Sequence, residues 1–174
     1  MGDFNNDGKA DVAGNGAVIL GNGDGTFGSP INYPAGGGGA YIAVGDFNHD
    51  GNLDIGGSIS SNQVDVMLGN GDGTFRTPKN FTVGKTPTSV AVSDFNADGN
   101  VDIAVLNSGW SDVSVLLGNG DGTFQPATYF AEEGIFNSTA VADLNGDGSR
   151  DIAVEGAYLL FNRPAGAAAL LSPS

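Results

Sequence analysis

Short apolar segments separated by polar, glycine-rich turns recur along the whole chain. Apolar and polar residues alternate within these segments, which indicates half-buried β-strands, and no segment has the 3.6-residue period of an amphipathic helix. Asn, Asp, Gly and Pro, which favour turns, separate the segments. The sequence therefore predicts an all-β protein. The expected strands are 11–13, 41–44, 54–59, 64–68, 79–83, 89–92, 102–106, 113–117, 128–131, 138–141, one near Ile152, and 158–161.

Two motifs repeat along the chain with nearly the same period. Asp-Phe-Asn-x-Asp-Gly-x-x-Asp, with Leu144 for Phe in its fourth copy, has spacings of 43, 48 and 49 residues; it begins at Asp3, Asp46, Asp94 and Asp143. Gly-Asn-Gly-Asp-Gly-Thr-Phe has spacings of 48 and 49 residues; it begins at Gly21, Gly69 and Gly118. A period of about 45 to 50 residues with several short strands per unit predicts β-propeller blades, here four-stranded and antiparallel.

The repeats are incomplete at both ends. The first lacks a strand before Asp3, and in the last repeat residues 163–166 stand where the glycine-rich turn is expected. We expect residues 1–162 to form about 3.5 to 4 blades and residues 163–174 to be a tail or linker. Because unpaired sheet edges favour association, the chain is expected to self-associate. A dimer could complete a larger ring, a strand could be exchanged between subunits in a filament, or four blades could close on their own.

The first motif has the composition of a calcium loop. Side chains at positions 1, 3, 5 and 9 and the backbone carbonyl at position 7 supply hard oxygen ligands, and the glycine at position 6 permits a sharp turn. Magnesium fits less well, because it requires a stricter octahedron and keeps its waters. Turn capping by Asp and Asn alone does not explain why positions 1, 3, 5 and 9 are all fixed while position 4 varies. The predicted ligands are Asp3, Asn5, Asp7, Lys9 and Asp11; Asp46, Asn48, Asp50, Asn52 and Asp54; Asp94, Asn96, Asp98, Asn100 and Asp102; and Asp143, Asn145, Asp147, Ser149 and Asp151.

Net charge supports the same interpretation. The formal charge is −14, from 20 acidic and 6 basic residues, and 12 of the acids lie in the four loops. Such a balance argues against nucleic-acid binding, which needs clustered Lys and Arg. We expect about four Ca²⁺ ions per chain, with metal binding coupled to folding.

The combination of Asp-Phe-Asn-x-Asp-Gly-x-x-Asp with Leu-Gly-Asn-Gly-Asp-Gly-Thr-Phe resembles the FG-GAP or VCBS repeats of integrin alpha-like β-propellers and bacterial surface proteins. The resemblance covers roughly residues 2–162. It implies that each acidic loop joins the first two strands of a blade, that seven blades are typical, and that the protein is extracellular or at the cell surface. No signal peptide and no apolar run near the roughly 18 residues of a membrane span is visible.

The remaining chemistry favours a non-catalytic module. The chain has no cysteine, and its one histidine, His49, occupies the variable loop position, where a solvated residue is expected. Asp24, Asp72 and Asp121 are expected in hairpin turns in preference to second cation sites, with Phe27, Phe75 and Phe124 as packing anchors between blades; Phe27 and its two equivalents close the glycine-rich motif.

Two function classes remain open. The first is a calcium-stiffened structural or adhesive module that can self-assemble or bind a protein ligand. The second is a lectin-like propeller, because Trp110, the only tryptophan, could stack on a sugar ring; its alternative role is to cover a blade edge.

Overall fold

The structure is a computed structural model in which residues 1–14, 16–33, 41–60, 62–131, 138–154, 158–161 and 169–171 are described. These ranges contain strands and turns and no helix, and therefore no helix long and apolar enough to cross a membrane. The strands are β1 Val12–Gly14, β2 Ala17–Ile19, β3 Ile31–Asn32, β4 Ile42–Gly45, β5 Asp54–Ser60, β6 Gln63–Met67, β7 Lys79–Thr82, β8 Pro87–Ser93, β9 Asp102–Asn107, β10 Asp112–Leu116, β11 Thr128–Ala131, β12 Thr139–Ala142, β13 Asp151–Val154, β14 Tyr158–Phe161 and β15 Ala169–Leu171.

The strands form four antiparallel sheets, each built from strands consecutive in sequence. Blade 1 is β1-β2-β3, blade 2 is β4 to β7, blade 3 is β8 to β11, and blade 4 is β12 to β15. Each acidic loop of blades 2 to 4 connects the first strand of its blade to the second, as the family resemblance implies. The all-β blade architecture expected from the repeats is therefore confirmed.

Alternate side chains of β9 pack against two different blades. All six residues from Asp102 to Asn107 are buried, because the strand lies between two blades. Ile103 and Val105 pack against blade 2, while Ala104 and Leu106 pack against blade 4. A period of two therefore gives a central strand two apolar faces.

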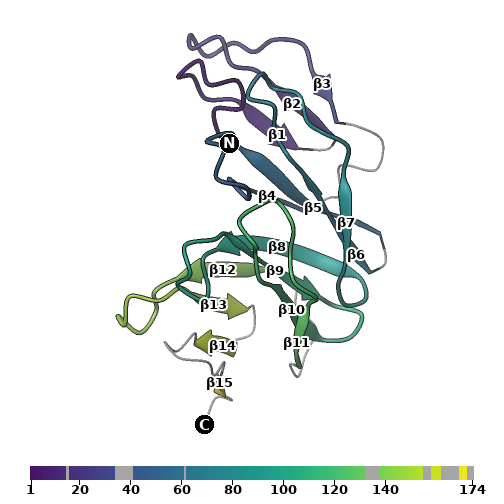
Figure 1. Ribbon diagram of the computed structural model, residues 1–174, viewed down its shortest axis with the longest axis vertical. Coiled ribbons are helices and arrows are strands. Elements are labelled where there is room, and N and C mark those ends of the chain that lie inside the picture. Colours follow the sequence, from purple (N-terminus) through teal and green to yellow (C-terminus); the bar gives the residue numbers. More distant parts are fainter. Residues whose placement is uncertain are drawn as a thin grey trace.

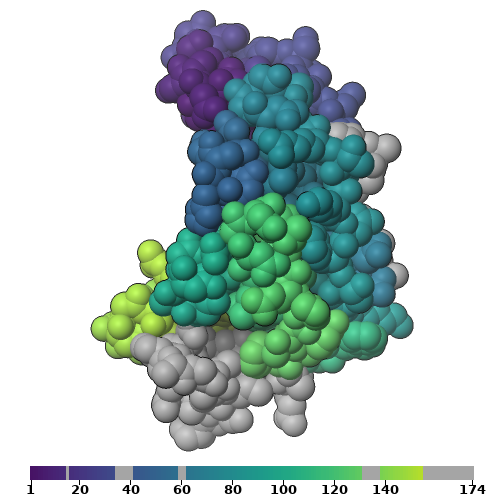
Figure 2. Space-filling view, in the orientation of Figure 1, coloured from purple at the N-terminus to yellow at the C-terminus, as the bar shows by residue number. Residues whose placement is uncertain are grey.

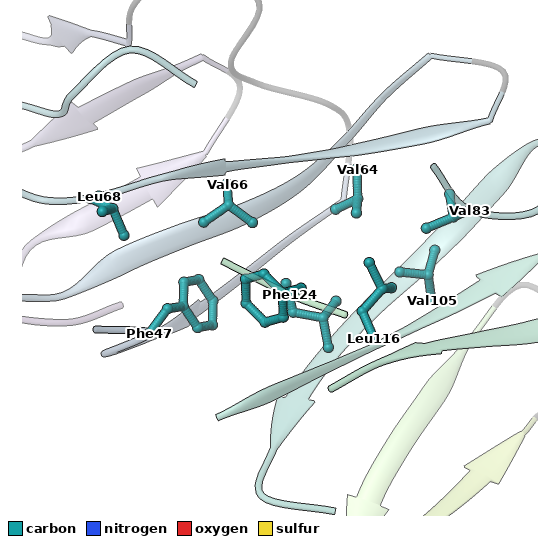
Figure 3. Packing of buried hydrophobic residues seen from close by; sticks show 9 residues of the cluster. Phe47, Val64, Val66, Leu68, Val83, Val105, Leu116 and Phe124 are labelled. Carbon is teal, nitrogen blue, oxygen red and sulfur yellow. The ribbon is translucent and has the colours of Figure 1, made fainter. Parts of the chain in front are cut away.

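Three apolar clusters join successive blades. The cluster between blades 2 and 3 contains Phe47, Val64, Val66, Leu68, Val83, Ile103, Val105, Leu116 and Phe124. Figure 3 shows the side chains of Val64, Val66 and Leu68 pointing across this interface toward blade 3. Comparable clusters lie between blades 1 and 2 and between blades 3 and 4. The hydrophobic core is thus a series of interfaces between sheets.

Aromatic residues at the end of the second and third glycine-rich turns anchor these interfaces. The ring of Phe124 lies 5.5 Å from that of Phe47 and 5.3 Å from that of Phe81, both edge-to-face. The expected anchoring by Phe124, and by Phe75 on the blade before it, is confirmed. Phe27 differs, because 51% of it is exposed.

The two ends of the array differ from each other. In blade 1 a single bridge between Gly2 and Asp11 stands where the other blades have a first strand. In blade 4, β15 pairs with β14, so this blade has four strands. The expected tail at 163–174 thus contains a strand, and its other residues lie outside the described part of the chain. Figure 1 places blades 1 and 4 at opposite ends of the molecule, so the expected alternative of a closed four-bladed ring is not formed.

A carboxylate that belongs to no acidic loop is buried in blade 2. Asp65 is fully buried in β6, and neither of its oxygens has a hydrogen-bond partner. Burial raises the pKa of Asp65 to about 6. In blade 3 the matching residue is Ser114, whose hydroxyl accepts a hydrogen bond from the Gly84 N–H. Asp65 therefore places a charge where its counterpart is neutral and paired.

Replacing Phe124 by Ala should lower the free energy of unfolding by about 3 to 4 kcal/mol, because it leaves a cavity between blades 2 and 3. The matched change Phe27→Ala should cost less than about 1 kcal/mol, since that ring is half exposed. Chemical denaturation at low protein concentration measures both values. Equal losses would contradict the role of Phe124 as an anchor.

Replacing Asp65 by Asn should stabilise the protein at pH 8 by up to about 3 kcal/mol and change little at pH 4. The folded-state pKa of about 6 lies above the value near 4 of an unfolded chain. The wild-type protein therefore loses stability as the pH rises through this interval, whereas Asn does not ionise. Denaturation at both pH values measures the difference. Asp72→Asn is the control, because Thr74 lowers the pKa of Asp72 and no gain at pH 8 is expected; a gain for Asp65→Asn that does not change with pH would contradict the account.

Candidate metal centre

The acidic loops share a tightly wound backbone. The glycine at position 6 has positive φ in every copy, for example 83° at Gly51. Position 4 is also in the left-handed region, with φ of 57°, 58° and 59° at Asn6, His49 and Ala97, and is glycine in the fourth copy, Gly146. These two residues turn the chain so that the side chains at positions 1, 3 and 5 point to the same side.

The third loop shows how these side chains converge. The Asp98 N–H donates to Asp94 Oδ1 at 3.2 Å and to Asn96 Oδ1 at 3.0 Å, so both oxygens lie next to one nitrogen. Gly99 N–H donates to Asp94 Oδ2 at 2.9 Å, and Asn100 N–H donates to Asp98 Oδ1 at 2.7 Å. The other loops repeat this arrangement around Asp7, Asp50 and Asp147.

The amides of the loop favour ionised carboxylates at position 5. The Asn100 N–H, followed by the side-chain amide of Asn96, lowers the pKa of Asp98. In the fourth loop the Ser149 N–H lowers the pKa of Asp147, although burial opposes the shift. These side chains are therefore negatively charged at neutral pH and available to a cation.

The aspartate at position 9 has a second role that the motif alone does not reveal. Asp54 is fully buried, and its two oxygens accept hydrogen bonds of 2.8 Å from the N–H groups of Phe47 and Gly69. Asp11 and Asp102 do the same, and Asp151 accepts from Leu144 N–H at 2.9 Å. The carboxylate therefore joins the acidic loop to the glycine-rich turn of its own blade. The one feature of the sequence that could have indicated this link is the regular succession of the acidic motif and the glycine-rich motif.

Burial makes this aspartate sensitive to its surroundings. Burial raises the pKa of Asp54 to about 6, the nearby charges of Asp50 and Asp46 add to the rise, and the two N–H donors oppose it. The pKa of Asp102 is raised for the same reasons. A cation in the loop would oppose the repulsion between these carboxylates.

The donor set suits calcium in its chemistry. Positions 1, 3 and 5 offer only carboxylate and amide oxygens, the hard ligands that calcium prefers, and the position-7 carbonyl adds another. In the described part of the chain no three Asp, Glu, His or Cys side chains gather at one point as a cation site. The physical reason is that position 3 is Asn and position 9 is turned to backbone N–H groups. Each carboxylate oxygen has two lone pairs, so these hydrogen bonds leave acceptor capacity for a metal.

Neighbouring loops touch one another. Asn6 Nδ2 donates to Asn52 Oδ1 at 2.8 Å, and His49 Nε2 lies 3.0 Å from Asn100 Oδ1. The backbone is linked too, because Gly122 N–H donates to the Phe47 carbonyl at 2.9 Å. Position 4 of one loop thus contacts position 7 of the next loop. His49 is exposed, as expected, and it also contacts Asn100.

The glycine-rich segments are turns that use their own aspartates. Asp72 Oδ1 accepts hydrogen bonds from both the N–H and the hydroxyl of Thr74, and a bridge between Gly69 and Phe75 closes the turn. Asp24 and Asp121 are bound in the same way. The structure therefore has turns here, as expected, with each aspartate hydrogen-bonded within its turn.

Trp110 lies on the surface of blade 3 beside a groove. It is 59% exposed, and its ring lies 6.4 Å from that of Tyr129, which is 47% exposed. Tyr129 also lines an open groove of about 440 Å³ between blades 2 and 3. The other lining residues are Asn80, Phe81, Thr82, Leu116, Phe124, Gln125, Pro126 and Ala127.

Comparisons with known proteins agree with this architecture. A lectin from Agrocybe aegerita, described as recognising non-reducing terminal N-acetylglucosamine, is 27% identical with a TM-score of 0.57, over 83% of this chain and 40% of the lectin chain. The Tc holotoxin pore of Photorhabdus luminescens is 19% identical with a TM-score of 0.52, over 86% of this chain and 8% of the toxin chain, and this likeness shows the fold alone. No curated protein matches the sequence.

A family model, the FG-GAP-like repeat, matches three times, over residues 3–56, 57–105 and 94–154. Each match contains at least one complete acidic motif. Together the matches cover residues 3–154, and each runs across parts of two successive blades. The chain therefore belongs to the FG-GAP-like repeat family and has a β-propeller fold.

Proposed function

We propose that the four acidic loops bind calcium, about four ions per chain, and that the ions stiffen the corners between the first two strands of successive blades. One observation carries this proposal: in all four loops the oxygens of positions 1 and 3 converge on the N–H of position 5. Asp and Asn side chains held this way present several oxygens to a single point. The ligands are those expected from the sequence, with position 9 shared between the metal and the glycine-rich turn.

Charge supports a stabilising role for the ions. The loops hold 12 of the 20 acidic residues of a chain with a formal charge of −14, and four calcium ions would reduce this to −6. Relief of repulsion within each loop favours the folded state, so calcium and folding are coupled.

The module is non-catalytic in this proposal. The loop carboxylates are committed to metal and backbone, and the only histidine contacts Asn100 of the neighbouring loop. We assign the chain a structural or adhesive role outside the cell or at its surface, with self-association through its blade faces.

Calcium titration of the metal-free protein by calorimetry should show about four sites, and calcium should raise the melting temperature relative to chelator. Asp98→Asn should remove or weaken one site by about tenfold or more, because ligand charge sets calcium affinity. Asp121→Asn is the control, since it changes an exposed aspartate of a glycine-rich turn and should leave every site intact. Identical melting temperatures with calcium and with chelator would overturn the proposal.

Carbohydrate binding is a second candidate, favoured by the groove beside Trp110. Sugar sites combine an aromatic face with amide hydrogen bonds, and this groove has Tyr129 together with Asn80 and Gln125. The similar Agrocybe aegerita lectin, described as recognising terminal N-acetylglucosamine, supports this class of ligand.

If the groove binds sugar, N-acetylglucosamine should perturb the Trp110 fluorescence of the wild-type protein in a saturable way. Trp110→Ala and Tyr129→Ala should each weaken binding, measured by calorimetry, because they remove the aromatic surface. Tyr41→Ala serves as the control, since Tyr41 is 41% exposed and precedes blade 2 away from the groove. Sugar affinity that both variants retain would place any binding elsewhere.

A further inference from the structure

The joints between blades 1 and 2 and between blades 2 and 3 follow one template. An aromatic residue from the glycine-rich turn of one blade enters the preceding blade, where it meets the residue at position 2 of the acidic loop. Phe75 meets Phe4, with ring centroids 6.0 Å apart, and Phe124 meets Phe47 at 5.5 Å. A backbone bond accompanies each contact: Gly73 N–H donates to the Phe4 carbonyl, and Gly122 N–H donates to the Phe47 carbonyl, both at 2.9 Å.

The two halves of this template recur, exposed, on the outer blades. Phe27 occupies the place of Phe75 and Phe124 and is 51% exposed. Leu144 occupies position 2 of the fourth loop, the place of Phe4 and Phe47, and is 45% exposed. Most other large apolar side chains of the described blades are at least partly buried. Figure 2 shows blade 1 in purple and the fourth loop in yellow-green at opposite ends of the same face.

We propose that a second copy of this chain docks head to tail, with Phe27 of one copy against Leu144 of the other. The contact repeats the internal joints, so Gly25, which matches Gly73 and Gly122, would donate to the Leu144 carbonyl of the second copy. Because both halves belong to one chain, a second copy is the partner that carries the complementary surface. This inference rests on the proposed self-association and identifies its surface.

Charge at the joint favours the same partner. Inside the chain, position 7 of one loop touches position 4 of the loop before it, as Asn100 touches His49. Across the proposed joint, position 7 is Lys9 and position 4 is Gly146 of the second copy, in the loop that carries Asp143 and Asp147. Lys9, which pairs with Asp7 of its own loop at 3.2 Å, therefore also faces the acidic loop of the second copy, whereas the other loops have Asn or Ser at position 7.

A joint between two different surfaces of the same chain is heterologous. It leaves one free end of each kind on a dimer, so it continues until the rotation closes a ring, or extends as a filament if it does not close. The apolar part of the contact is small, so we expect reversible assembly that depends on protein concentration and weakens at high salt.

Sedimentation of the wild-type protein in calcium buffer should show assemblies larger than one chain. Phe27→Ser and Leu144→Ser should each shift the protein to the mass of one chain with its melting temperature retained at low protein concentration, because both side chains are about half exposed. Trp110→Ser is the matched control, since it removes an aromatic residue that is 59% exposed and should leave assembly unchanged. Assembly that survives both the Phe27 and the Leu144 changes would overturn this joint while leaving self-association in place. A wild-type protein of single-chain mass at all concentrations would overturn both.

Crosslinking locates the contact directly, because the chain contains no cysteine. Phe27→Cys and Leu144→Cys variants, mixed in calcium buffer and treated with a short thiol crosslinker, should form a covalent dimer. Phe27→Cys mixed with Trp110→Cys should not. Equal yields from both mixtures would overturn the joint. The calcium proposal is judged separately, from the melting temperature with and without chelator.

Discussion

The structure of each repeat depends on one buried carboxylate. Burying a charge is costly unless the group is hydrogen-bonded, and Asp54 receives two backbone N–H groups, one from its acidic loop and one from its glycine-rich turn. These bonds fix the loop relative to the turn, although the two lie 15 residues apart in the sequence. The loop in turn sets the corner between the first two strands. Removing this carboxylate would therefore release the acidic loop, the glycine-rich turn and the corner between the first two strands together.

The same arrangement joins one blade to the next. The turn held by Asp102 brings Phe124 against Phe47 and brings Gly122 N–H to the Phe47 carbonyl. The first and second acidic loops are therefore braced from their own blade by an aspartate and from the next blade by a glycine-rich turn. A cation in one loop would act on a unit that extends over two blades, which is why we describe the ions as structural.

Much of this could be predicted from the sequence, because turn residues and alternation are local signals. The strands around the second and third loops, the loops themselves and the anchoring role of Phe124 follow from their spacing in the repeat. The double role of Asp54 could not be predicted, since it depends on a hydrogen bond to a turn that is distant in sequence. Nor could β15, because the three apolar residues 169–171 carry no alternation or turn signal of their own and pair only once β14 is in place.

The unpaired carboxylate of Asp65 was also invisible in the sequence. It occupies an ordinary polar position of an alternating strand, and only the approach of a neighbouring blade makes that position buried. Likewise, the left-handed backbone at position 4 accommodates Asn, His, Ala and Gly, so its conformation is hidden by variation in residue type.

The central claim is that the acidic loops hold calcium. A crystal structure of the protein grown with calcium tests it most directly. The account predicts an ion in each loop, with oxygens of positions 1, 3, 5 and 9 and the position-7 carbonyl at about 2.3 to 2.6 Å. Well-ordered loops that contain only water at saturating calcium would contradict it.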